Sequence, residues 1–186
     1  MVRVIGPKDP PMLKIDALDV TSHSLTWSRA LSPFLLGPCP LYGSYVAQNV
    51  ENGWQYAKVY PVHLDDTGEP SEAYWVWAKK GWKATRAVRY PMGKGFRPEY
   101  SYWNGEKLQY IEARKQIYAP LYAAAVRNSP AWELLKNAYI QNPDLRLWDF
   151  DGYDSIKLGS WEEALNDPNR TMGHAFVLAM MLEGIM

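Results

Sequence analysis

Apolar residues recur at helical spacing over several stretches of the chain, which favours a mostly helical fold. The strongest pattern covers residues 106–128, where Pro120 should kink or divide the helix because it lacks a backbone N–H. Further helices are expected at residues 71–82, 129–142, 160–167 and 171–185. The last of these is apolar on nearly every face, so we expect it to be buried.

Residue types at the ends of two of these patterns indicate where the helices start and stop. Ser71 is an expected N-cap, and Gly81 is the expected end of that helix. Ser129 is a second expected N-cap, followed by Pro130 at the first helical position. These signals make the boundaries of both helices specific predictions.

Strand patterns are short and few. Residues 1–5 and 145–148 read as strands, the second leading into an acidic turn. Residues 23–28, "HSLTWS", alternate apolar and polar positions and predict another strand. Residues 32–43 form a loop broken by proline and glycine, and residues 86–105 form a long irregular or strand-like connector; functional residues are often found in such segments. We therefore predict a mostly helical α+β fold, one domain over residues 1–186, with a small sheet and long functional connectors.

The segment "ENGWQYAKVY" predicts a helix that begins near an Asn49 N-cap and ends by Pro61. At about 100° per residue, Val50, Trp54 and Ala57 form one narrow apolar stripe along it. This stripe is the expected buried face of the helix.

Three polar residues of the same segment, Glu51, Gln55 and Lys58, fall at the edge of that stripe. Two interpretations are open. They form an ordinary amide contact and ion pair on a solvated flank, or they form a half-buried pair in which desolvation lowers the lysine pKa and makes the amine a nucleophile.

Composition narrows the classes of partner. The chain has 20 basic and 20 acidic residues, so no overall field attracts nucleic acid or membranes, although a local basic patch is open. A single cysteine, Cys39, excludes an internal disulfide and fits a cytoplasmic protein. No signal-peptide pattern is visible, and the longest apolar run is too short for a bilayer, so we expect no membrane association. Nine tryptophans and thirteen tyrosines serve either a core or the stacking of flat ligands.

The Glu-x-x-x-Gln-x-x-Lys spacing of "ENGWQYAK" resembles the signature helix of the NADAR (YbiA-type) family, Glu-His-Tyr-Phe-Gln-Ala-Gln-Lys. The likeness continues in order over residues 27–183, through "LSPFLLGP", "RYPMGKGFRP", "EKLQYIEARKQIYAPLYAAAV", "LWDFDGYD" and "NRTMGHAFVLAMMLE". Pro33 stands where the family has an asparagine.

The resemblance implies an N-glycosidase that removes ADP-ribose or ribose from a nucleobase. The substrate would be guanine-ADP-ribose in DNA or RNA, or a ribosylamino nucleotide. In the family the helix Glu and Lys line the site, and the Lys has a covalent Schiff-base role. By this likeness Glu51 and Lys58 are catalytic in the present sequence.

Cleavage of an N-glycoside builds positive charge on the anomeric carbon, so further carboxylates are useful near the site. Asp149 and Asp151 are candidates for a catalytic role on a water or on ribose hydroxyls, if the segment is extended and both point the same way. The alternative is an ordinary turn built from Asp and Gly.

The predicted substrate-binding residues come from the matched segments and from the need to stack a base and hold phosphates. They are Ser32, Phe34, Trp54, Gln55, Arg89, Lys94, Arg97, Trp148 and Gly173, with Trp103 as a further stacking candidate. A solvated basic loop is the alternative for the three cations.

The histidines indicate no metal site. His23 and His63 have no partner at ligand spacing, and His174, in an apolar helix, is expected to be a hydrogen-bonded core residue. We expect no cofactor.

Two alternatives to an enzyme are open. One is a non-catalytic module that binds nucleotides or nucleic acid, and the other is a structural protein whose aromatic residues form only core and interface. Oligomeric state is open.

Overall fold

The computed structural model describes all 186 residues and divides into two compact units. Unit 1 comprises Met1–Leu36 and Tyr122–Met186, and unit 2 comprises Gly37–Leu121. More residues lie in helices than in strands in each unit, so the predicted α+β, mostly helical fold is confirmed. The single domain over residues 1–186 stays a prediction. No helix combines the length and apolar character needed to cross a bilayer.

Unit 1 contains one parallel three-stranded sheet, in the order β1-β8-β2, and most of the helices. Its strands are β1 (Arg3–Ile5), β2 (Leu18–Asp19) and β8 (Arg146–Trp148). Its helices are α1 (Pro11–Lys14), η1 (Trp27–Leu31), α6 (Pro130–Gln141), η4 (Ser155–Lys157), α7 (Trp161–Asn166) and α8 (His174–Leu182). Helix α5 (Ala119–Arg127) begins in unit 2 and ends in unit 1.

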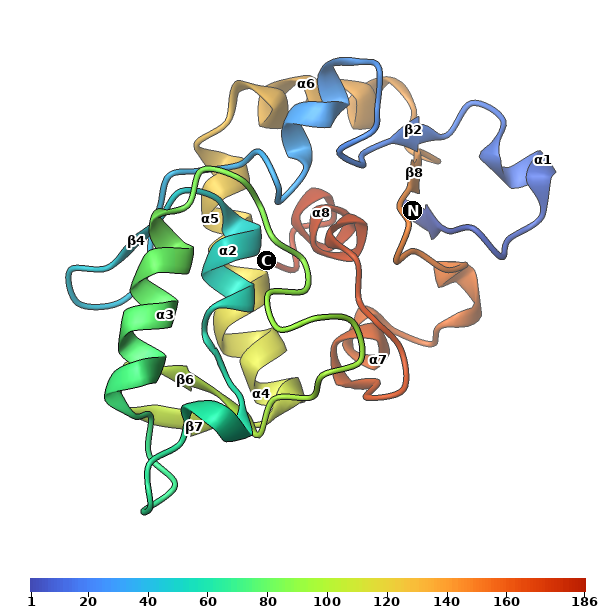
Figure 1. Cartoon of the computed structure of the whole chain (residues 1–186). Coiled ribbons are helices and arrows are strands. Elements are labelled where there is room, and N and C mark those ends of the chain that lie inside the picture. Colours follow the sequence, from blue (N-terminus) through green and yellow to red (C-terminus); the bar gives the residue numbers. More distant parts are fainter. The chain divides into compact units, whose positions relative to one another are not determined.

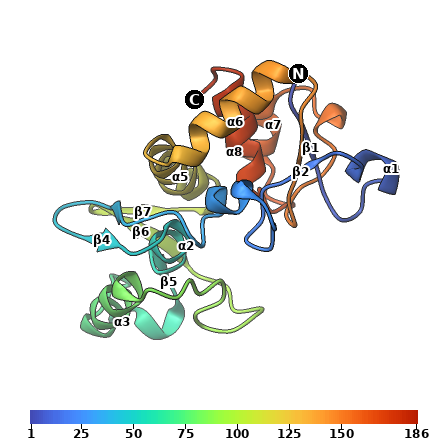
Figure 2. The ribbon, with the colours of Figure 1, turned by 90° about the horizontal axis from the view of Figure 1, so that it is seen from above.

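Helix α8 is the centre of the unit 1 core. All residues from His174 to Met181 are buried, as its continuous apolar sequence predicts. Helix α7 and strand β1 lie beside it (Figure 2). Around this helix Tyr122 donates a hydrogen bond from its hydroxyl to the carbonyl of Leu31, at 2.6 Å.

Unit 2 contains two antiparallel sheets, β3-β4 and β5-β6-β7. Its strands are β3 (Cys39–Pro40), β4 (Val46–Ala47), β5 (Lys58–Val59), β6 (Tyr100–Trp103) and β7 (Glu106–Leu108). Its helices are α2 (Val50–Gln55), η2 (Pro61–His63), α3 (Glu72–Lys83), α4 (Tyr110–Ala113) and the π-helical segment η3 (Arg114–Tyr118). Helices α2 and α3 lie side by side (Figure 1).

The predicted N-terminal ends of α3 and α6 agree with the structure, whereas the predicted C-terminal end of α3 does not. Ser71 and Ser129 are N-caps whose hydroxyls accept backbone N–H groups, as expected. Gly81 does not end α3, however, and lies inside the helix. Its role is close packing, since a Cβ at Gly81 would lie 2.0 Å from the Tyr56 ring.

The strand predicted for residues 23–28 is wrong. These residues form bends that lead into η1, and Leu25 is fully exposed. Short hydroxyl side chains explain the difference, because they bond one another and the backbone locally instead of joining a sheet. The Ser28 Oγ lies 3.0 Å from that of Ser24 and 2.8 Å from the hydroxyl of Thr26, and it also donates to the Asp19 carbonyl.

The long helix predicted from residue 106 begins later. Residues 106–108 form β7, which pairs with β6 through a turn at Asn104 and Gly105. Both turn residues have positive φ, 48° and 92°, the conformation that an Asn-Gly hairpin turn favours. The π-helical segment η3 ends at Tyr118, two residues before Pro120, so the helix continues into α5 but is irregular near the residue that was predicted to kink or divide it.

Candidate functional site

Helix α2 carries the first part of the candidate site. Asn49 is its N-cap, as predicted, and its side chain accepts the Asn52 N–H at 2.8 Å. All six residues of the helix are buried. The helix ends at Gln55, however, so the prediction that it includes Lys58 is wrong.

Lys58 therefore lies on strand β5, opposite Ser101 of β6, and not on the helix. Two sets of hydrogen bonds favour the strand. The Ala57 carbonyl accepts the Tyr102 N–H at 2.8 Å, and the Tyr74 hydroxyl donates to the carbonyls of Tyr56 and Ala57 at 3.2 and 3.3 Å. These partners replace the next helical turn.

Although Lys58 lies on a strand instead of the helix, the side chains of Glu51, Gln55 and Lys58 still lie together. The Gln55 Nε2 donates to Glu51 Oε1 at 3.0 Å, and the Lys58 Nζ donates to Gln55 Oε1 at 2.7 Å. Glu51 is only 5% exposed and Gln55 8%. The structure thus has the half-buried arrangement rather than a solvated flank, with Gln55 linking the carboxylate to the amine. We name Glu51, Gln55 and Lys58 the relay.

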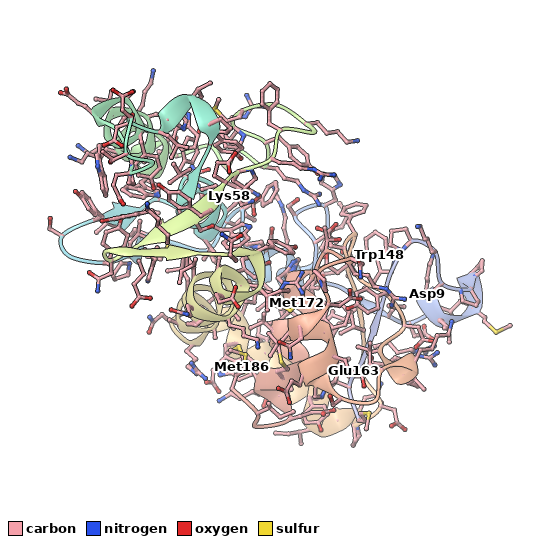
Figure 3. All side chains as sticks on the ribbon, turned by 90° about the horizontal axis from the view of Figure 1, so that it is seen from below. Asp9, Lys58, Trp148, Glu163, Met172 and Met186 are labelled. Atoms are coloured by element: carbon pink, nitrogen blue, oxygen red, sulfur yellow. The ribbon has the colours of Figure 1, made fainter.

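The environment of Lys58 favours the neutral amine. Burial lowers its pKa from 10.5 to about 8, the nearby Glu51 charge partly opposes this, and the Arg89 charge adds to it. The Nζ lies 4.6 Å from the centroid of the Trp54 ring. With a pKa near 8, about one amine in ten is neutral at pH 7, against about one in several thousand for an ordinary lysine. Figure 3 marks Lys58 in unit 2.

This pKa is measurable without a substrate. After reductive methylation with ¹³C-formaldehyde, we expect one dimethyl-lysine NMR signal to titrate near pH 8. The signal should disappear in Lys58→Arg. In Glu51→Gln it should titrate at lower pH, since the charge that favours the ammonium is lost. An ordinary titration midpoint for Lys58 would contradict the assignment.

Aromatic and cationic residues of η3 lie close to α2. The Tyr118 ring is 5.5 Å from the Trp54 ring, and both side chains are buried. Arg114 is 2% exposed; its Nη2 donates to the Tyr110 hydroxyl at 2.9 Å and its guanidinium lies 4.7 Å from that ring centroid. Sequence reasoning missed Arg114. The only indication in the sequence was Pro120, because it predicts an irregular helix nearby, and irregular helical turns often carry functional residues.

Asn52, which sequence reasoning also missed, fixes the start of the connector that follows α3. It is fully buried, and its side-chain amide makes three hydrogen bonds of 2.9 to 3.0 Å to backbone groups of residues 84–88. Asn49 adds a fourth, at 3.2 Å. These bonds hold Arg89, one residue further on, within electrostatic range of Lys58.

The other predicted residues of unit 2 lie further along the connector or on β6. Lys94 and Arg97 are exposed, and Trp103 is half-buried with its ring 4.9 Å from that of Tyr42. The phosphate-binding role of the two cations stays a prediction, and the structure places Lys94 on a solvated glycine loop.

Asp149, in unit 1, has a buried structural setting. It is 4% exposed, its Oδ2 lies 3.1 Å from His174 Nδ1, and it accepts the Ala175 N–H at the start of α8. The His174 Nε2 lies 2.7 Å from the Val20 carbonyl, which can only accept, so this nitrogen donates. His174 is thus the hydrogen-bonded core residue that the sequence predicts.

Charge pairing sets the ionisation of these two groups. Burial disfavours the charged form of both groups, but the attraction and hydrogen bond between Asp149 and His174 outweigh this effect. The pKa of Asp149 therefore lies below its usual value, and the pKa of His174 lies above its usual value. Gly173 leaves room for this contact, because a Cβ there would lie 2.2 Å from Asp149 Oδ2. Its substrate-binding role stays a prediction, while its packing role is evident.

The acidic segment after β8 is a turn rather than an extended strand. The Asp151 N–H donates to Asp149 Oδ1 at 3.3 Å, and the Gly152 N–H to the Asp149 carbonyl at 3.0 Å. Of the two alternatives left open by the sequence, the structure therefore has the turn built from Asp and Gly, which the Asp149 side chain closes. A catalytic role for either carboxylate stays a prediction.

Three further predicted residues belong to unit 1. Ser32 is buried and its hydroxyl accepts the Phe34 N–H at 3.3 Å. Trp148 is half-buried, with its ring 4.8 Å from that of Phe150 (Figure 3). Their substrate-binding roles are untested by these contacts.

A family model covers most of the chain. Residues 10–178 match the model of a family of unknown function, DUF6939. The chain belongs to the DUF6939 family. No curated protein and no solved structure matches the sequence. The chemistry of this DUF6939 protein therefore has to be inferred from its own residues.

In the DUF6939 protein, the relay offers a nucleophile and an orienting carboxylate. A neutral lysine amine is able to attack electrophilic carbon, and a carboxylate in the position of Glu51 is able to stabilise positive charge or accept a proton. Gln55 donates a hydrogen bond to Glu51 and accepts one from Lys58, which fixes the orientation of the Gln55 amide and keeps the lysine side chain in place. The buried Trp54 ring lies beside the amine, with its centroid 4.6 Å from Nζ.

Proposed function

We propose that this DUF6939 protein hydrolyses an N-glycosidic bond, removing ADP-ribose or ribose from a nucleobase. The observation that carries the proposal is the relay, a buried carboxylate joined through an amide to a lysine whose pKa is lowered to about 8. The Glu-x-x-x-Gln-x-x-Lys likeness to the NADAR signature supports the same reaction class.

The proposed first step is attack by the neutral Lys58 amine on the anomeric carbon. The Nζ lone pair forms the new bond while the bond between carbon and base breaks, and its electron pair goes to the base. The base gains a proton and the nitrogen loses one. Ring opening then sends the pair of the bond between the anomeric carbon and ring oxygen to that oxygen, which is protonated, and leaves an imine on Nζ.

Water completes the cycle. It adds to the imine carbon, the bond to Nζ breaks, and the free sugar and the lysine amine are restored. In this scheme Glu51 stabilises the positive charge of the transition state and the imine. Gln55, which is hydrogen-bonded to both groups, holds Nζ in place relative to Glu51. Trp54 stacks on the departing base.

Product analysis tests the proposal. The purified protein is incubated with guanine-ADP-ribosylated DNA or RNA and with ribosylamino pyrimidine nucleotides, and released base and sugar are separated by chromatography. We expect release from at least one substrate. We also expect a sodium-borohydride-reducible adduct, with the mass of the sugar, on the peptide that contains Lys58.

The exposed Lys115 of unit 2 serves as the matched control, because Lys115→Ala removes an amine with little loss of contact. It should keep both turnover and the adduct. If the protein binds these substrates but releases no base or sugar, the glycosidase proposal is rejected in favour of a non-catalytic binding module. Release with an adduct at a different residue would reject Lys58 as the nucleophile.

A further inference from the structure

Positive charge is concentrated in one stretch of a chain that is neutral overall. Residues 73–98 contain no acidic residue, and the rest of the sequence therefore carries a formal charge of −7. The stretch contains seven cations: Lys79, Lys80, Lys83, Arg86, Arg89, Lys94 and Arg97. All of them belong to unit 2, and all but Arg89 are exposed.

The three lysines share one face of α3. At about 100° per residue, Lys79, Lys80 and Lys83 fall within roughly 100° of one another on the solvent side. The half-buried rings of Tyr45 and Trp75 stack at the edge of this face, 6.0 Å apart and 23° from parallel. The Lys79 Nζ lies over both, at 5.6 and 5.9 Å. Cations and ring faces are therefore combined on one side of the helix.

The connector continues this combination from the C-terminal end of α3 (Figure 1). Its backbone is fixed at residues 84–88 by Asn52, while two large rings further on project into solvent, Tyr90 at 49% and Phe96 at 63% exposed. The Arg89 guanidinium lies 5.4 Å from the Tyr90 ring centroid. Exposed aromatic rings among cations have no evident role in the core of unit 2.

We infer that α3 and this connector form a binding surface for single-stranded nucleic acid. Phosphates of a strand would pair with the exposed cations, and its unstacked bases would stack on Tyr90 and Phe96. A duplex offers its phosphates but keeps its bases stacked, so a single strand uses both features. The inference does not depend on the proposed function, since it concerns residues outside the relay and is measured by binding alone.

Fluorescence anisotropy with a fluorescein-labelled oligo-dT of about 20 nucleotides tests the surface in the full-length protein. We expect binding that weakens steeply with salt. The double variant Lys80→Gln/Lys83→Gln should bind about 10- to 30-fold more weakly near 0.1 M salt. Its plot of log affinity against log salt should be shallower by about 1.4, because two phosphate contacts are lost.

The matched control is Lys8→Gln/Lys115→Gln, which removes the same charge from exposed positions outside the stretch and should bind as the wild type does. Phe96→Ala should weaken binding about tenfold with no change in salt slope, whereas Phe150→Ala, a second exposed ring, should not. Circular dichroism confirms that each variant is folded.

Three results would overturn the inference. The wild type shows no binding at low salt, the two lysine double variants bind equally, or Phe96→Ala binds as the wild type does. If the protein binds vesicles of anionic phosphatidylserine more tightly than the oligonucleotide, the inferred ligand would be a membrane surface and not a nucleic acid. Glycosidase activity is not a readout in any of these measurements, so they stand apart from a failure of the proposed function.

Discussion

Lys58→Ala is expected to lower glycosidase turnover by about 1,000-fold or more, because it removes the attacking amine. The reason is the unusual availability of that amine, whose pKa is lowered to about 8 by burial. In the wild type, turnover should rise with pH until about pH 8 and then level off, since the neutral form is the active one. Initial rates of base release across pH 5.5–9.5 check both statements.

Two variants separate this effect from a general loss of packing. Lys58→Arg keeps a cation at the position but cannot supply a neutral nitrogen, so we expect it to be as inactive as alanine. Glu51→Gln should lose about 100-fold in turnover and shift the pH midpoint downward, because the charge that raises the Lys58 pKa is removed. Lys58→Ala with wild-type turnover would exclude the relay as the reacting centre.

Asp149→Ala is expected to lower the free energy of unfolding by about 3–5 kcal/mol, because it leaves His174 buried without its charge partner. The same change removes the carboxylate that accepts the Ala175 N–H at the start of α8. Urea unfolding of wild type and variant at pH 6 measures the difference.

The control for this variant is Asp144→Ala, whose side chain is 96% exposed and whose contact to the N-terminus is solvated; the expected change is below about 0.5 kcal/mol. The ion pair of Asp149 and His174 also makes the free energy of unfolding depend on pH. The lowered pKa of Asp149 contributes stability above about pH 4 that is lost on acidification, and the raised pKa of His174 contributes stability that is lost as pH rises above about 6.5. The contribution is therefore largest between these values. An Asp149→Ala protein as stable as the wild type across this range would contradict the ion pair.

Signals that act within a few residues allowed good predictions. The N-caps Asn49, Ser71 and Ser129 are found where expected, because each satisfies backbone N–H groups of its own helix. The buried character of α8 follows from its own sequence. The Asn-Gly turn between β6 and β7 was equally local, but it stands at the end of the predicted connector, directly before the helix expected from residue 106.

Features set by distant partners were not predictable in the same way. Lys58 joins a strand because β6, some forty residues later, supplies hydrogen bonds to β5. Asn52 reads as an ordinary helix residue until the backbone of residues 84–88 comes to it. Asp149 reads as part of an acidic pair until α8 brings His174 to it. The composition of the relay was predictable from spacing, whereas its geometry depended on these contacts.

The contact between Gly81 and the Tyr56 ring limits how these two positions can vary. An alanine at position 81 would place its methyl carbon 2.0 Å from the ring, so one side has to yield. A homologue with any larger residue at 81 should carry a smaller side chain at 56. Since Tyr56 is the residue directly after Gln55, such a paired exchange would also alter the turn that delivers Lys58 to β5, and the two changes should be inherited together.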